Sequence, residues 1–302
     1  MKHSPLYQFT KISLRTAWII VMTIICTITA YPLIFSFLVS LMTQKELTTL
    51  GSFFIWPPKP TLENYRVLFS LSGAIRPTMN SFIRTAYWTI INTTIHLLGG
   101  YFLARYEFKA KKAIIIGIIV VQVIPGVLTM MPSFILMSRI PFVGGNNWMG
   151  LGGRGIINSP AVLYVPMGWG VFLGSFLCMQ SIRGLPRSFE EAAEIDGYDF
   201  WRIILKIVIP MQTPILAVLA IGSALGTWND WMTPFLYINK PEETTLNGWL
   251  GTMTASLQQV GDTRNYPAIF ALANLAMIPP FLLFLFFQKF IIQGIASVGI
   301  KE

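Results

Sequence analysis

Carboxylates that could do chemistry are concentrated in one segment of the chain, residues 183–210. The segment reads RGLPRSFEEAAEIDGYDFWRIILKIVIP and holds five of the 13 acidic residues. Ser188 and Glu191 have the spacing of a capping box, and Gly197 is placed to end the short helix with a positive φ. A short helix with small alanines and a sharp turn can dock into a groove on a partner protein. The alternative is an amphipathic hairpin that merely connects two membrane spans.

The helical period predicts which side chains of the short helix share a face. Phe189, Ala192 and Ala193 recur on one face, and Glu190 and Glu194 lie on another. A second helix is expected after the Gly197 turn, capped by Asp199 and ended by Pro210. Its apolar positions are Phe200, Trp201, Ile204, Leu205 and Val208.

Asp230 is the only acidic residue inside an apolar run. That run, 213–238, is the fifth of six predicted membrane spans. At 1.5 Å per residue Asp230 lies about 25 Å from the cytoplasmic end of this span, and therefore near the outer interface. Trp228, Asn229 and Trp231 surround it in the sequence. Aromatic rings suit the C–H faces of sugars, and amides and carboxylates suit their hydroxyls, so a site at the mouth of a transport path is one interpretation. An aromatic interfacial belt with a structural cap is the other.

Other polar side chains inside apolar runs are candidates for the same path. Asn92 falls in the second run (80–104), Gln122 in the third (113–138) and Tyr164 in the fourth (161–182). Hydrogen bonding between helices is the alternative role for them. His96 has no carboxylate companion in the sequence, which disfavours a proton relay. Gly174 in the fourth run favours close packing of helices.

The elements that position these residues follow from composition. The chain has 302 residues, of which 54% are hydrophobic and 12% charged, and its mean hydropathy is +0.60. A soluble domain would expose large apolar patches at this composition, and disorder requires low hydrophobicity. We therefore predict an all-α polytopic membrane protein with about six transmembrane helices. The six apolar runs are 17–42, 80–104, 113–138, 161–182, 213–238 and 267–291.

The formal net charge of +9 is explained by the concentration of Lys and Arg in cytoplasmic loops. With a cytoplasmic N-terminus, 13 of the 22 basic residues lie inside, and the tightest cluster occupies the short loop 105–112. Both termini are therefore predicted to be cytoplasmic, and no nucleic-acid partner is implied. The expected regions are an N-terminal segment 1–16, a first span with its external loop 17–79, a core of five spans 80–292, and a tail 293–302.

No cofactor or metal site is expected on this chain. The glycine-rich second external loop, 139–160, lacks the phosphate-loop pattern G-x-x-x-x-G-K-[ST]. Cys26 and Cys178 fall in apolar runs and are interpreted as small buried hydrophobes. The two histidines have no neighbouring cluster of metal ligands.

The residue pattern from Glu191 to Pro210 resembles a motif of a known protein family. Glu191-Ala192-Ala193, then Gly197, then Ile207-Val208-Ile209-Pro210 resembles the EAA motif of membrane subunits of bacterial ATP-binding-cassette importers. That family has leucine before the final proline, where this chain has Ile209. Further segments are similar to permeases of maltose-type carbohydrate importers: 57–65, Asn80-Ser81-Phe82, 103–106, Trp228-Asn229-Asp230 and 287–290.

The resemblance implies a type I importer permease in the bacterial cytoplasmic (inner) membrane. Its expected partners are a second homologous permease, two ATPase subunits that carry ATP and Mg, an extracytoplasmic sugar-binding protein and the lipid bilayer. It also implies that the short cytoplasmic helix is a coupling helix that enters a cleft of the ATPase. The residues expected to do this are Ser188, Phe189, Glu190, Glu191, Ala192, Ala193, Glu194, Asp196 and Gly197.

Two rival functions predict features that the sequence lacks. An ion-coupled secondary transporter of a small polar solute predicts ionisable residues near the bilayer midplane. An intramembrane enzyme predicts paired carboxylates or a His/Glu metal set at helical spacing. The excess of basic over acidic residues outside the membrane permits an acidic oligosaccharide, and contacts with phospholipid or the binding protein explain it equally well.

Overall fold

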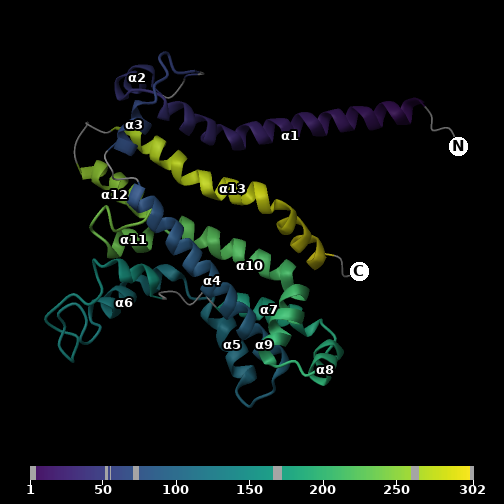
Figure 1. Cartoon of the computed structure of the whole chain (residues 1–302). Coiled ribbons are helices and arrows are strands. Elements are labelled where there is room, and N and C mark those ends of the chain that lie inside the picture. Colours follow the sequence, from purple (N-terminus) through teal and green to yellow (C-terminus); the bar gives the residue numbers. More distant parts are fainter. Residues whose placement is uncertain are drawn as a thin grey trace. The chain divides into compact units, whose positions relative to one another are not determined.

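The computed structural model consists of helices and loops, and the part of the chain that it describes contains no β-strand (Figure 1). The prediction of an all-α chain is thus confirmed. The backbone is described at residues 5–51, 54, 56–70, 75–165, 172–259 and 265–299. Side chains are described within these ranges at 15–51, 54, 56–69, 75–165, 172–254 and 265–288.

The helices alternate between long apolar stretches and short connecting pieces. They are α1 (Pro5–Ser40), α2 (Gln44–Leu50), α3 (Glu63–Ser70), α4 (Ile75–Arg105), α5 (Lys111–Val121), α6 (Gly126–Ser138), the 3-10 helix η1 (Pro160–Tyr164), α7 (Leu173–Arg183), α8 (Ser188–Ile195), α9 (Phe200–Ile203), the π-helix η3 (Ile204–Val208), α10 (Ile209–Asn229), α11 (Met232–Tyr237), α12 (Leu246–Gln259) and α13 (Tyr266–Gly299).

The chain divides into two compact units. Unit 1 comprises Met1–Leu71 and Ser256–Ala276. Asn64 on α3 joins α3 to the end of α1, because its Nδ2 donates to the carbonyl oxygens of Ser40 and Met42 at 2.8 Å each. Ser36 Oγ donates to Asn274 Oδ1 on α13 at 2.8 Å. Polar side chains therefore hold this small unit together, as is common between membrane helices.

Unit 2 comprises Ser72–Ala255 and Met277–Glu302. It contains the candidate coupling segment 183–210 and the candidate path residue Asp230. Its centre is α4, which packs against α7 on one side and α10 on another. Two glycines permit the close approach of α4 and α7. A Cβ added to Gly100 would lie 2.4 Å from Cys178 Cβ, and one added to Gly174 would lie 2.4 Å from His96 Cδ2. The packing role expected for Gly174 is thus confirmed.

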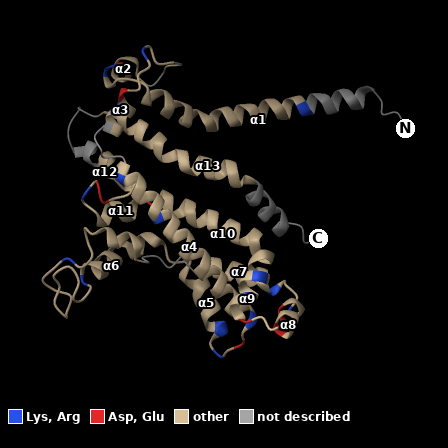
Figure 2. Cartoon of the chain, in the orientation of Figure 1, with Lys and Arg blue, Asp and Glu red and all other residues tan. Residues whose placement is uncertain are grey.

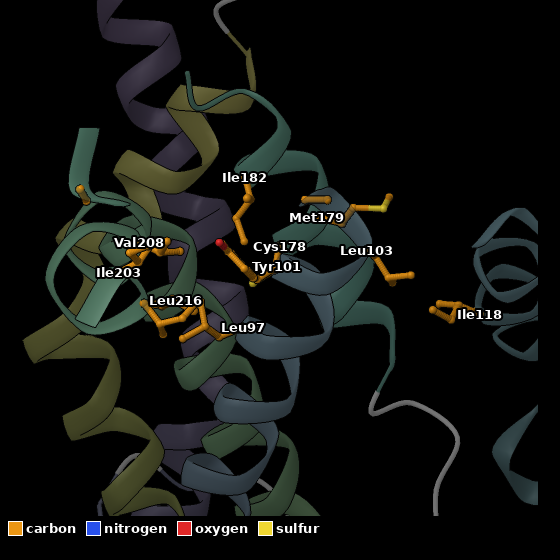
Figure 3. Packing of buried hydrophobic residues seen from close by; sticks show 13 residues of the cluster. Leu97, Tyr101, Leu103, Ile118, Cys178, Met179, Ile182, Ile203, Val208 and Leu216 are labelled. Atoms are coloured by element: carbon orange, nitrogen blue, oxygen red, sulfur yellow. The ribbon is translucent and has the colours of Figure 1, made fainter. Parts of the chain in front are cut away.

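The main apolar core of unit 2 lies at the end of α4 that leads into α5 (Figure 3). Fully buried side chains of α7 fill its middle, and α8 contributes Ala193. The short helix α8 is therefore part of the packed core. The members are Leu97, Tyr101, Leu103, Ala104, Ile118, Cys178, Met179, Ile182, Ala193, Ile203, Ile204, Val208 and Leu216.

Three helical stretches in the described ranges are long and apolar enough to cross a membrane: Arg15–Ser40, Phe200–Tyr237 and Tyr266–Gln288. They correspond to the first, fifth and sixth predicted runs. The second run forms one helix, α4, which is long but carries charged and polar residues and is not among the three.

The third and fourth runs differ from straight spans. The third run is broken into α5 and α6, and the axes of these two helices make a bend of 101° at the break. If the pair is one span, it is the fourth candidate membrane span of the described residues. Pro125 caps α6 and has no backbone N–H to continue the preceding helix, which explains the break. The fourth run begins with η1, and α7 starts only at Leu173; residues 166–171 lie outside the described ranges.

One cysteine prediction was wrong. Cys178 is fully buried in the core, but Cys26 is exposed on α1. An apolar run alone does not reveal which residues of a membrane helix meet other helices, because the whole circumference of such a helix is apolar.

Candidate functional site

The short helix α8 spans Ser188–Ile195, inside the predicted range 188–197. The expected capping box was wrong. Arg187 is the N-cap and makes no side-chain capping hydrogen bond, and Ser188 is already the first helical residue. The helix starts one residue early because the Arg187 carbonyl accepts from the backbone N–H groups of Glu190 and Glu191. Glu190 and Glu191 still place negative charge in the first turn, where the helix dipole favours it.

The buried face of α8 combines one residue from each of the two predicted faces. Glu190 and Ala193 are the buried residues, and Phe189 and Ala192 are exposed. A spacing of three residues puts Glu190 and Ala193 on one side of the helix. The rest of the helix points away from the core and is free for a partner; this surface consists of Phe189, Glu191, Ala192, Glu194 and Ile195, followed by the exposed Asp196.

Glu190 anchors α8 to α4 through a buried ion pair. Arg105 at the end of α4 places its Nη2 2.6 Å and its Nε 2.8 Å from Glu190 Oε1. The Tyr101 hydroxyl donates to Glu190 Oε2 at 2.9 Å, and Arg105 Nη2 also donates to the Leu185 carbonyl at 3.1 Å. Both carboxylate oxygens therefore have partners, as a buried charge requires.

The turn after α8 follows the sequence prediction. Gly197 has φ +80, and a Cβ placed there would meet no atom within 4 Å. Glycine is thus favoured by the backbone conformation alone and not by crowding. Asp199 caps the next helix, with its side chain accepting from the Arg202 N–H at 3.1 Å.

Pro210 does not end that helix, contrary to the prediction. The helix runs from α9 through the π-turn η3 into α10, and Pro210 lies in the first turn of α10. The π-turn changes the hydrogen-bonding register just before the proline, so the missing N–H does not interrupt a regular ladder.

Basic residues gather at this end of unit 2 (Figure 2). They come from the end of α4, the start of α5 and the connection between them, from the end of α7 and its connection to α8, and from α9 and η3. In the first of these regions, Lys111 Nζ lies 2.7 Å from Glu107 Oε1, and this hydrogen bond lowers the pKa of the Glu107 carboxyl. The cluster consists of Arg105, Lys109, Lys111, Lys112, Arg183, Arg187, Arg202 and Lys206.

A cavity of about 700 Å³ lies elsewhere in unit 2, between α4, α7 and α10. Its lining is mixed. Trp88, Asn92 and His96 come from α4, and small residues such as Gly222 and Gly226 come from α10. Its size falls in the range of about 300–1,000 Å³ that is typical of small-molecule sites.

The charged side chains lining this cavity, among the residues that the structure describes, are Arg84 and Asp230. Arg84 Nη2 donates to Asp230 Oδ2 at 2.6 Å. Arg84 is 6% exposed, and its Nε also donates to the Leu163 carbonyl at 3.3 Å. Asp230 Oδ1 accepts from the Thr233 N–H at 3.0 Å, so this carboxylate both pairs with Arg84 and accepts a hydrogen bond from the first turn of α11.

Arg84 was missed by the sequence analysis. It lies 146 residues from Asp230, so no local spacing links the two. A usable signal existed, because an arginine inside the apolar run 80–104 is itself a candidate for function. A search for its partner would have pointed to the acidic residue in the fifth run.

The structure brings Asn92 and Asp230 to the cavity and leaves the other predicted path residues outside its lining. Trp228 is buried against Phe82, with ring centroids 5.0 Å apart. Asn229 and Trp231 are exposed, and Gln122 is exposed in the break between α5 and α6. Tyr164 packs edge-on against Tyr87. A path role for these residues stays a prediction.

No group of three or more His, Cys, Asp or Glu side chains that could hold a metal occurs among the described residues. The two sites of unit 2 are an exposed helix face with a glycine turn and a cavity of mixed polar and apolar lining that includes an ion pair.

The chain is similar in sequence to curated proteins and in fold to a solved structure. The chain is 28% identical over 279 residues to the arabinooligosaccharides transport system permease protein AraQ of Halalkalibacterium halodurans, covering 92% of this chain and 93% of AraQ. It is 26% identical to the melibiose/raffinose/stachyose import permease protein MelC of Bacillus subtilis, covering 95% and 98%. A crystal structure of a bacterial ABC transporter involved in the import of the acidic polysaccharide alginate has the same fold, with a TM-score of 0.70, 18% identity and coverage of 96% and 99%.

A family model described as "binding-protein-dependent transport system inner membrane component" matches residues 96–297. This range is more than half of the chain and includes α5–α12 and the whole α7–α10 segment. The chain therefore belongs to the family of inner membrane components of binding-protein-dependent transport systems.

Proposed function

We propose that this chain is a permease subunit of an ATP-binding-cassette importer for sugars or oligosaccharides. The observation that carries the proposal is the family match over residues 96–297. Relatives similar over more than nine-tenths of the chain are named for arabinooligosaccharides and for melibiose, raffinose and stachyose. In this proposal the chain forms the translocation path with a second homologous permease, and an extracytoplasmic binding protein delivers the sugar.

The proposed topology has six spans in the bacterial cytoplasmic membrane with both termini inside. The apolar stretches support at least three spans, and the basic cluster at one end of unit 2 supports placing that end in the cytoplasm. The bent α5–α6 pair, α4, and η1 with α7 supply the remaining three. Residues 80–292 form the core permease region.

We assign ATPase coupling to α8 and its glycine turn. The inward residues Glu190 and Ala193 fix the helix to the core, and the outward residues Phe189, Glu191 and Ile195 are exposed for a partner. ATP and Mg belong to two partner ATPases, and this chain carries no cofactor. Closure of the ATPases would move α8, and the Arg105–Glu190 pair would pass that motion to α4.

Affinity capture of the chain after gentle detergent extraction from native membranes tests the partners. Recovery of an ATPase and a second permease supports the proposal. Recovery of the chain alone, with transport in vesicles that needs an ion gradient and no ATP, contradicts it and favours a secondary transporter of a small polar solute.

Two variants test the coupling segment in the intact importer. Gly197→Asp and Glu191→Lys should insert normally but lose ATP-driven uptake, because they alter the turn and the exposed face. Glu63→Lys on α3 is the matched control, because it reverses an exposed carboxylate outside this segment. Wild-type uptake in both coupling variants would contradict the assignment.

A further inference from the structure

The cavity of unit 2 has a balanced charge. Arg84 and Asp230 are its charged lining residues within the described part of the chain, and they form a 2.6 Å ion pair. The one positive and one negative charge cancel, and the rest of the lining is uncharged polar or apolar apart from His96. A solute inside this cavity therefore meets strong local dipoles but no net charge.

Several polar atoms of the lining residues have no partner in the protein. They are Arg84 Nη1, Asn92 Oδ1 and His96 Nδ1. Each of these atoms has less than 1 Å² of accessible surface, so they do not face the open volume of the cavity, and a solute there would meet the other polar groups of the lining residues. Arg84 is 6% exposed, so its charge acts on the cavity chiefly through its ion pair with Asp230.

Sugar hydroxyls both donate and accept hydrogen bonds, so they match uncharged polar groups of either kind. Hydroxyl side chains of Ser223 and Thr227 also line the cavity. Trp88 adds an aromatic ring, which its Nε1 hydrogen bond to the Leu163 carbonyl at 2.9 Å holds in place.

We propose that this cavity binds a neutral, hydroxyl-rich solute, with Arg84 and Asp230 as specificity-determining residues. The inference rests on the proposed sugar-import function and narrows its substrate class. A carboxylate-bearing solute would reach Arg84 only by displacing Asp230 or by lying beside that carboxylate. Like charges repel, so acidic sugars are disfavoured.

Direct binding to the purified, complete importer in lipid nanodiscs tests the proposal without the selectivity of the binding protein. The probes are three-ring sugars: raffinose and arabinotriose, which are neutral, and trigalacturonate, which is acidic. Saturation-transfer NMR should give signals from the neutral sugars at least tenfold stronger than those from trigalacturonate. Equal or stronger binding of trigalacturonate overturns the proposal, as does the absence of signal from both neutral sugars.

A filling variant and a charge variant locate the site. Gly222 lines the cavity, and an added Cβ there meets no atom within 4 Å, so Gly222→Leu should occupy the cavity and reduce neutral-sugar binding at least tenfold. Gly117→Leu on α5 is the matched control, because Gly117 also has open space but does not line this cavity. Asp230→Asn should shift the preference at least tenfold towards trigalacturonate, because Arg84 is then unpaired.

The charge variant keeps the test decisive if Gly222→Leu fails to assemble with its partners. A purely structural role of Asp230 would reduce binding of all probes together and leave their ratio unchanged, which would overturn the proposal. ATP-driven uptake of raffinose or arabinotriose by cells carrying the complete importer is measured separately. If the wild-type importer takes up sugar but these variants bind sugar as the wild type does, the cavity is not the binding site and the proposed import function still stands. If the wild-type importer shows no ATP-dependent sugar uptake, the proposed function itself is rejected.

Discussion

Helix α4 carries two buried arginines that pair with carboxylates in different regions of unit 2. Arg84 and Arg105 lie about 30 Å apart along the helix axis at 1.5 Å per residue, roughly the thickness of the bilayer hydrocarbon. Arg84 pairs with Asp230 at the cavity, and Arg105 pairs with Glu190 on α8. Both pairs have a shortest N–O distance of 2.6 Å, so distance alone does not distinguish them.

The two pairs differ in how completely their polar atoms are used. In the Arg105–Glu190 pair, Tyr101 takes the second carboxylate oxygen, and the pair is packed beside the apolar core. In the Arg84–Asp230 pair, Arg84 Nη1 is unused, and both residues line a cavity. A complete network fixes one arrangement of two helices, whereas the Arg84–Asp230 pair borders the cavity proposed to hold a solute. We therefore propose attachment of α8 as the role of the Arg105–Glu190 pair and recognition of a solute as the role of the Arg84–Asp230 pair.

The largest effect is expected when the complete network is broken. Glu190→Ala leaves the Arg105 guanidinium buried without a counter-charge, which should destabilise the attachment of α8 by about 3–5 kcal/mol. Hydrogen exchange of the α8 amides measures this as faster local opening. Glu194→Ala is the control, because Glu194 is exposed on the same helix. Similar exchange in the two variants would show that Glu190 does not anchor α8.

A smaller effect is expected at the cavity pair. Arg84→Met leaves Asp230 without its ion-pair partner, but the Asp230 side chain is 25% exposed and keeps its hydrogen bond from the Thr233 N–H. We expect a loss of about 1–3 kcal/mol in the free energy of unfolding of unit 2, measured by reversible detergent unfolding. A loss as large as that of Glu190→Ala would mean that both pairs are equally structural.

The sequence predicted the elements of these regions better than their contacts. The hydrophobic excess and the long apolar runs predicted the helices that include 17–40, 209–229 and 267–288, because burial in lipid requires apolar residues over the whole helix surface. Gly197 and Asp199 acted as predicted, because turn and cap preferences are local. The bend at Gln122–Pro125 had only a proline as its signal, and its angle depends on packing that no local pattern encodes.

Pairing between distant residues was beyond the sequence. Helical spacing groups Glu190 with Ala193 as readily as Phe189 with Ala192, and only the position of Arg105, 85 residues earlier, decides which group is buried. The same holds for Arg84 and Asp230. A single sequence contains the charges but not the packing of α4 against α7 and α10 that brings them together.

The turn after α8 tests whether the anchor alone positions the helix. Gly197→Ala should destabilise the turn by about 1–2 kcal/mol, because φ +80 is strained for a residue with a Cβ. Since the added Cβ meets no atom within 4 Å, the effect should be confined to the backbone. Hydrogen exchange of residues 195–199 measures it, and Gly117→Ala on the exposed face of α5 is the control. No change in exchange would show that the anchor is sufficient.

The smallest effect on stability, and the sharpest separation of the two pairs, is expected from replacing whole pairs by apolar residues. A buried ion pair exchanged for apolar side chains of similar volume is often neutral or stabilising, so Arg84→Met with Asp230→Leu should change the free energy of unfolding by less than about 1 kcal/mol. Arg105→Met with Glu190→Leu should be similarly mild, although the Tyr101 hydroxyl then loses its acceptor.

Function should nevertheless separate these double variants. The cavity double variant removes the groups that recognise a solute, so sugar uptake by the complete importer should fall at least tenfold while α8 exchanges hydrogen at the wild-type rate. The α8 double variant keeps apolar packing between α8 and α4, so it should retain most of the uptake. If both variants transport sugar equally well, the Arg84–Asp230 pair has no role in recognition, and the two pairs are alike in function as well as in chemistry.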